Sequence, residues 1–70
     1  MSFADNVVRL RKEKGYSQAE LARKLEVSQA SLAQYEKGIK IPNIVNAVKL
    51  AQLLGTTCEE LVKYAIENIL

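Results

Sequence analysis

The sequence predicts an all-α protein, a compact bundle of five short helices in a single domain that spans residues 1–70. Three features predict this fold class. A Ser or Thr followed three residues later by Asp or Glu, a pattern typical of helix starts, opens three of the predicted helices. The three glycines each follow an amphipathic segment, where the left-handed backbone that ends a helix costs glycine little. No segment of strand length alternates convincingly between apolar and polar residues.

The first helix is expected from about Phe3 to Lys14. Ser2 and Asp5 form the predicted capping pair at its start, and Gly15 follows its last turn. Its apolar residues recur at spacings of four and three, so they share one face of the helix. These residues are Phe3, Val7 and Leu10.

The second helix is expected from about Gln18 to Leu25, with Ser17 and Glu20 as its capping pair. Three apolar residues lie within a narrow arc when 100° is counted per residue: Leu21, Ala22 and Leu25. The charged residues of this segment point elsewhere. The segment is therefore a short amphipathic helix with one buried side.

The third helix is capped by Ser28 and runs to about Lys37, before Gly38. Leu32 and Tyr35 lie on the side expected to face the core. The opposite, outward side consists of Gln29, Ala30, Ala33 and Gln34. A helix that meets only water usually carries Lys and Glu on its outer side, so this uncharged side is unusual.

The fourth helix follows a loop over 39–43, in which Pro42 disfavours helical backbone at the preceding residue. Its apolar positions are Ile44, Ala47, Val48, Ala51 and Leu54, and Gly55 ends it. Thr57 and Glu60 form the capping pair of the fifth helix, which reaches nearly to Leu70. Cys58 near this start is expected to be a small apolar residue rather than a reactive thiol.

The fifth helix, about 58–70, has two apolar stripes roughly 100° apart. Leu61 and Ala65 lie on one stripe, which can cover the core. The other stripe consists of Val62, Ile66, Ile69 and Leu70. A chain of 70 residues has nothing left to cover it, so we expect this stripe to be the interface of a homodimer. The alternative is a frayed end with scattered apolar residues.

Composition excludes several classes of function. The chain has no His and a single Cys, which excludes a His-based catalytic triad, a disulfide within the chain and a Cys or His metal cluster. Without a glycine-rich phosphate loop or a paired acid cluster, no enzyme, metal or cofactor is expected, and no small-molecule ligand is evident. No signal peptide or membrane-spanning run is visible, and a chain that folds by packing alone fits the cytoplasm.

Charge is concentrated in the first part of the chain. Residues 1–40 carry eight Lys and Arg against five Asp and Glu, whereas residues 41–70 carry two against three. A polyanion responds to such local potential more than to the total of +2. The overall charge permits nucleic-acid binding but does not demand it.

Two short helices joined by a tight turn, here about 18–37, are the core of a helix-turn-helix. Ala22 supplies the small residue needed where the helices cross. The second of them, about Ser28–Lys37, then presents its outward side to a DNA major groove. A glutamine amide matches N6 and N7 of adenine, and alanine can contact a thymine methyl group. The candidates for base recognition are Gln29, Ala30, Ala33 and Gln34.

These residues resemble the helix-turn-helix of the phage repressor and Cro family, also called the XRE family. The resemblance is carried by the segment 17–25, by Val27-Ser28-Gln29 and by Tyr35-Glu36-Lys37-Gly38. It continues in Leu10–Gly15, and later in Pro42, Leu50-Ala51, Leu54-Gly55 and Glu60-Leu61. Roughly residues 6–63 are covered. The resemblance implies a lambda-repressor-like fold and double-stranded DNA as the partner.

Roles carry over where residues match. The family's glutamine at the position of Gln18 contacts a phosphate, and Gln29 and Gln34 match positions that contact base edges. Arg11 and Glu36 match an ion pair that joins the first helix to the end of the third. The implied phosphate-binding residues are Ser17, Gln18, Ser28, Lys37, Lys40 and Asn43. The plain alternative for the glutamines and lysines is that they are solvated, and for Arg11 and Glu36 that they are unrelated surface charges.

Two residues depart from the family pattern. Glu26 stands where glycine is usual, so the resemblance implies a turn at positive φ that costs on the order of 1 kcal/mol. Ala30 is shorter than the polar residue often found there, which limits it to methyl contacts. The function expected is a sequence-specific transcriptional regulator that binds a palindromic operator as a homodimer. The alternative is a protein-interaction module, such as an antitoxin or adaptor, with the same helical fold.

Overall fold

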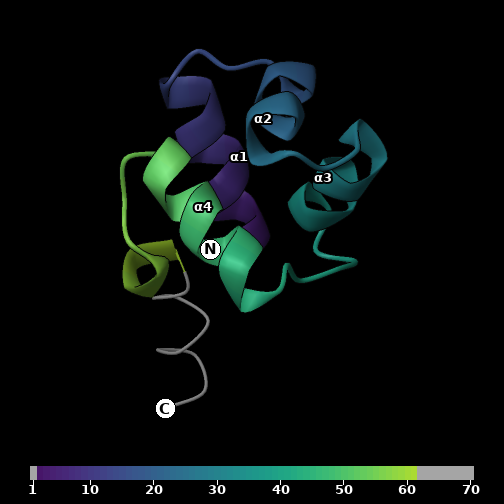
Figure 1. The fold of residues 1–70 in the computed structure, drawn as a ribbon. Coiled ribbons are helices and arrows are strands. Elements are labelled where there is room, and N and C mark those ends of the chain that lie inside the picture. Colours follow the sequence, from purple (N-terminus) through teal and green to yellow (C-terminus); the bar gives the residue numbers. More distant parts are fainter. Residues whose placement is uncertain (1, 62–70) are drawn as a thin grey trace.

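The computed structural model describes residues 2–61, which form four helices followed by a helical turn at 58–61 (Figure 1). The helices are α1 (Phe3–Glu13), α2 (Gln18–Leu25), α3 (Gln29–Glu36) and α4 (Ile44–Leu53). Within this range no strand occurs, which confirms the all-α fold class. The fifth helix starts where the sequence predicts. Residues 62–70 lie outside the described residues, and with them the whole stripe of Val62, Ile66, Ile69 and Leu70.

Each of the four helices begins at a side-chain cap. The N-cap residues are Ser2, Ser17, Ser28 and Asn43. In each, a side-chain oxygen accepts a hydrogen bond from the backbone N–H three residues later, at 2.9–3.2 Å. The first and third helices end one residue earlier than predicted, because Lys14 and Lys37 act as C-caps rather than as helical residues.

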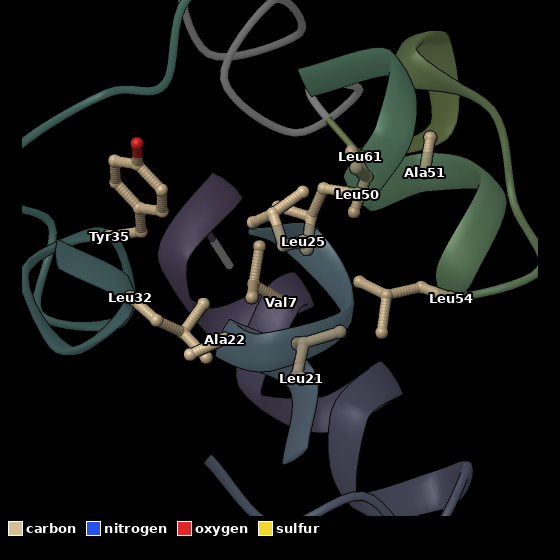
Figure 2. Close-up of a cluster of buried hydrophobic side chains, with 10 residues drawn as sticks. All are labelled: Val7, Leu21, Ala22, Leu25, Leu32, Tyr35, Leu50, Ala51, Leu54 and Leu61. Carbon is tan, nitrogen blue, oxygen red and sulfur yellow. The ribbon is translucent and has the colours of Figure 1, made fainter. Parts of the chain in front are cut away.

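The core lies between the four helices and includes the start of the fifth (Figure 2). Its fully buried side chains are Val7, Leu21, Ala22, Leu25, Leu32, Tyr35, Leu50, Ala51, Leu54 and Leu61. Helix α2 supplies three of them and packs against both α3 and α4, while α1 packs against α3. Because α2 is in the middle, the turn that follows it fixes the direction of α3.

Helix α4 is buried along a narrower side than its sequence predicts. Leu50, Ala51 and Leu54 are buried, but Ile44 and Val48 are 75% and 41% exposed. These two residues belong to the same apolar arc, yet they lie in the half of α4 nearest its N-terminus, whereas the buried residues follow at 50–54. The first half of α4 therefore presents apolar side chains to solvent.

Among residues 2–61, one polar side chain is buried. Asn6 on α1 is 2% exposed, and its Nδ2 donates a hydrogen bond of 2.9 Å to the backbone oxygen of Leu61. Its Oδ1 has no hydrogen-bond partner among the described residues. This contact attaches the start of the fifth helix to α1.

Candidate nucleic-acid interface

The turn between α2 and α3 has the geometry that the sequence implied. Glu26 is the only residue other than glycine with positive φ among residues 2–61, at φ 63° and ψ 39°. The next residue, Val27, donates its backbone N–H to the carbonyl of Ala22, and Ala22 itself is buried at 2% exposure. This left-handed turn redirects the chain so that only residues 26–28 separate α2 from α3.

Helix α3 has one buried side and one uncharged exposed side. Leu32 and Tyr35 are buried, as the helical arcs predict. Gln29, Ala30 and Gln34 are exposed, and Ala33 is half-buried at the edge of the same side. The expected outward face is therefore present, and its exposed members are short or carry an amide.

A chain of hydrogen bonds joins α1, α3 and α2 through four side chains, which we call the polar brace: Arg11, Glu36, Gln18 and Gln29. Arg11 donates from Nε to Glu36 Oε2 at 2.6 Å and from Nη2 to Glu36 Oε1 at 3.2 Å. Gln18 Nε2 donates to the same Glu36 Oε1 at 3.2 Å. Gln29 Nε2 then donates to Gln18 Oε1 at 3.3 Å.

The two charges of the brace are largely shielded from solvent. The side chains of Arg11 and Glu36 are 13% and 7% exposed, and Arg11 also donates to the backbone oxygen of Tyr16 at 3.0 Å. A bidentate, hydrogen-bonded pair of this kind has the geometry in which an ion pair holds its partners in place. The ion pair fixes the end of α3 against α1. Gln18, which is hydrogen-bonded to both Glu36 and Gln29, links this ion pair to the first residue of α3.

The brace leaves part of Gln29 available for a ligand. One N–H of its amide is directed to Gln18, so the carbonyl oxygen and the second N–H remain for an adenine edge. Sequence reasoning missed the contact between the two glutamines. Their separation of 11 residues becomes a contact only through the angle that the turn sets between α2 and α3.

The start of α2 holds two of the expected phosphate-binding residues. Ser17 is exposed and forms a reciprocal capping box with Glu20, whose carboxylate accepts the Ser17 backbone N–H at 3.1 Å. That backbone hydrogen bond, with help from the Ser17 hydroxyl, lowers the pKa of the Glu20 carboxyl. Gln18 is half-buried, and its side chain belongs to the brace.

The other expected phosphate-binding residues are Ser28, Lys37, Lys40 and Asn43, and all are exposed. Ser28 Oγ caps α3 and donates to Ser31 Oγ at 3.0 Å. Asn43 Oδ1 caps α4, which leaves its NH₂ group as a donor. Lys37 and Lys40 flank the turn and loop that follow α3.

Metal clusters and membrane-spanning helices are both absent from the described residues. Residues 2–61 contain no group of three Asp, Glu, Cys or His side chains that could hold a metal ion. None of the helices in this range is long and apolar enough to cross a membrane.

Comparisons with known proteins agree with this geometry. A family model described as helix-turn-helix matches residues 7–61. A relative from Sinorhizobium fredii, an uncharacterized HTH-type transcriptional regulator called y4dJ, is 40% identical over 57 residues, which are 81% of this chain and 74% of the relative.

Two solved structures have the same fold. The P22 c2 repressor in complex with a synthetic operator is 25% identical, with a TM-score of 0.87, over 90% of this chain and 96% of the repressor. SinR, a master regulator for biofilm formation, in complex with DNA is 32% identical, with a TM-score of 0.78, over 84% and 95% of the two chains. The chain belongs to the XRE-type helix-turn-helix family, whose fold is that of DNA-binding transcriptional regulators rather than of a class of enzymes.

Proposed function

We propose that the protein is a sequence-specific transcriptional regulator that binds double-stranded DNA in the cytoplasm as a homodimer on a palindromic operator, with α3 in the major groove. The observation that carries the proposal is the polar brace. A glutamine at the start of an uncharged helix face is hydrogen-bonded, through Gln18, to a largely buried ion pair. A glutamine that contacts only water would gain nothing from being oriented in this way.

Base recognition is the task of the exposed side of α3. Gln29 and Gln34 offer amides to base edges, and Ala30 and Ala33 let the helix approach thymine methyl groups closely. An amide that is already oriented loses less side-chain entropy on binding than a free one. We therefore expect Gln29 to discriminate more strongly than Gln34, for which no side-chain hydrogen bond is found among residues 2–61.

Phosphate contacts position the helix. The start of α2 presents backbone N–H groups, where an anion is favoured by the unpaired donors and the helix dipole. Lys40 and Asn43, in the loop and at the cap of α4, are the candidates on the other side of α3. Contacts on both sides would hold α3 in register with the groove.

A homodimer gives so small a domain useful specificity. One recognition helix contacts few base pairs, whereas two related by a two-fold axis contact half-sites about 34 Å apart. The sequence supports self-association through the stripe of Val62, Ile66, Ile69 and Leu70. Palindromic operators follow from that symmetry.

The test compares Gln29→Ala with wild type on the best site found by selection from random DNA and on a scrambled sequence. We expect a loss of about 1–3 kcal/mol on the best site and little change on the scrambled one. Gln52→Ala, at an exposed glutamine of α4, is the matched control and should bind both as wild type does.

Lys40→Ala is the contrasting variant in the same experiment. It should weaken binding to both sequences alike and lower the slope of log affinity against log salt by about one unit. An equal loss on both sequences with Gln29→Ala would contradict base recognition. Absence of any DNA binding by the wild type at low salt would favour the protein-interaction alternative.

A further inference from the structure

The polar brace has a direction, because each of its hydrogen bonds has a donor end and an acceptor end. It starts at Glu36, whose carboxylate is paired with the Arg11 guanidinium and therefore accepts hydrogen bonds but donates none. Its Oε1 accepts from Arg11 Nη2 and from Gln18 Nε2, both at 3.2 Å. The amide of Gln18 must consequently turn its NH₂ group toward Glu36.

The direction of this first contact determines the direction of the next one. With its NH₂ group turned toward Glu36, the Gln18 amide has its carbonyl oxygen left for Gln29. That oxygen accepts a hydrogen bond of 3.3 Å from Gln29 Nε2. A carbonyl oxygen only accepts, so Gln29 must give it an N–H and has its own Oε1 left. The carboxylate thus fixes which end of the Gln29 amide is used inside the protein.

Burial makes this direction costly to reverse. The side chain of Glu36 is 7% exposed, and Gln18 is half-buried. A reversed Gln18 amide would place its carbonyl oxygen against the Glu36 carboxylate, with little water available to separate the two acceptors. Gln29 at the outer end is exposed, and among residues 2–61 its amide is hydrogen-bonded to Gln18. The direction is therefore set at the buried end of the brace and is transmitted outward.

The direction of the Gln29 amide matters for the choice of base. Adenine presents its N6 amino donor and its N7 acceptor in the major groove, whereas guanine presents two acceptors, O6 and N7. With one N–H given to Gln18, the Gln29 amide offers its Oε1 and one N–H, which match adenine. A reversed amide would give its oxygen to the brace and offer two N–H donors, which match guanine.

We propose that Glu36 is a positioning residue that determines which base Gln29 selects. Its carboxylate orients the Gln18 amide, and Gln18 orients the amide of Gln29 for adenine. This inference rests on the proposed function, namely base recognition by α3, and adds a shielded residue that acts on the choice of base without contacting one. The ion pair with Arg11 then has two roles, because it attaches α3 to α1 and also sets the direction of the brace.

The test measures base preference at one position of the operator. That position is the one at which Gln29→Ala lowers the discrimination among single-base variants of the best site. Fluorescence anisotropy then gives the ratio of the affinities for sites with adenine and with guanine at that position. We expect wild type to favour adenine at least about fivefold. A loss of folded protein or of a phosphate contact lowers both affinities alike, so a merely structural role would not move this ratio.

Gln18→Lys reverses the brace and leaves the ion pair of Glu36 with Arg11 in place. The lysine ammonium donates to Glu36, and since it has no acceptor it can only donate to Gln29 as well. Gln29 must then turn its oxygen inward. We expect the ratio of adenine to guanine affinity to fall at least about fivefold. Gln18→Ala is the matched variant, which removes both contacts and should bring the ratio toward one without favouring guanine.

Glu36→Gln tests the carboxylate itself, since the new amide can turn its NH₂ group toward Gln18 and so lower the ratio. Ser2→Ala, which removes the side-chain cap of α1, is the control for lost stability and should leave the ratio unchanged. A ratio that stays at the wild-type value in Glu36→Gln overturns the inference, and base recognition stands if Gln29→Ala still loses the preference. A wild type without base preference at any position overturns both proposals.

A measurement on the free wild type covers the case in which Glu36→Gln does not fold. Nuclear Overhauser contacts of the side-chain NH₂ protons report the direction of an amide. We expect contacts from the NH₂ protons of Gln18 to the γ-protons of Glu36. Contacts from these protons to the side chain of Gln29 instead would mean a reversed Gln18 amide, and would overturn the inference.

Discussion

The outward sides of α3 and α4 are both nearly free of charge, yet their chemistry differs. On α3 the exposed residues are glutamines and alanines, and the first glutamine is tied through Gln18 and Glu36 to Arg11. On α4 they include Ile44, Val45 and Val48, which have no hydrogen-bonding atom in their side chains, beside Lys49 and Gln52. Amides need directional partners and must be oriented, whereas aliphatic side chains need only a surface of matching shape. The first side has the directional groups that the proposed contact with base edges requires, and the second has none of them.

The largest expected effect tests whether α3 is held by the brace. Glu36→Ala should lower the free energy of unfolding by about 2–4 kcal/mol, because it leaves the Arg11 guanidinium largely buried with one acceptor. Urea unfolding measures this. Glu13→Ala, which removes an exposed ion pair to Arg9, is the matched control and should cost no more than about 0.5 kcal/mol. Equal small losses in both variants would show that the brace does not hold α3.

The next effect concerns the turn that sets the direction of α3. Glu26→Gly should raise the free energy of unfolding by about 0.5–1 kcal/mol, because glycine accepts φ 63° without strain. The greater conformational entropy of glycine in the unfolded chain offsets only part of this gain. Glu26 also lies 3.9 Å from Lys49 on α4, but both side chains are exposed and that contact contributes little. Glu26→Ala is the control, since it removes the same carboxylate and keeps the strain. A gain with alanine as large as with glycine would contradict this account.

The smallest expected effect is a difference in how the caps of α2 and α4 contribute to stability as the pH changes. The Ser17 backbone N–H lowers the pKa of Glu20, so this carboxylate stabilises the fold above its ordinary pKa. That contribution is lost as the pH falls through the lowered value in the folded protein. The cap of α4 is the neutral Asn43. We therefore expect the stability difference between wild type and Glu20→Gln to shrink on acidification from neutral pH to about pH 3. The difference between wild type and Asn43→Ala should stay constant.

The features that the sequence predicts well are those set by residues close together in the chain. A serine cap and its partner lie within four residues, so the starts of α1, α2 and α3 follow from short segments alone. The positive φ of Glu26 was implied by the family resemblance, since glycine is usual at that position, and the structure has it at 63°. The family resemblance indicated the pairing of Arg11 with Glu36, whose atoms the structure places 2.6 Å apart.

Features that depend on distant elements were not predictable in this way. Periodicity places Ile44 and Val48 on an apolar arc, but whether an arc is covered depends on which helix packs there. The contact of Gln18 with Gln29 needs the crossing angle of α2 and α3. Asn6, a polar residue within an amphipathic helix, gives no sequence signal of its burial, since its partner is the backbone of Leu61.

The hydrogen bond between Asn6 and Leu61 has a consequence for how the protein unfolds. Chain ends usually fray before the rest of a domain. Here the first helix and the start of the fifth share a buried hydrogen bond across 55 positions, and Leu61 is only 1% exposed. Neither the first helix nor the start of the fifth can separate from the other without breaking that bond in a dry environment and uncovering the leucine. Closing so long a loop costs entropy that only a formed core offsets, so we expect these two segments to join late in folding and to separate together in unfolding.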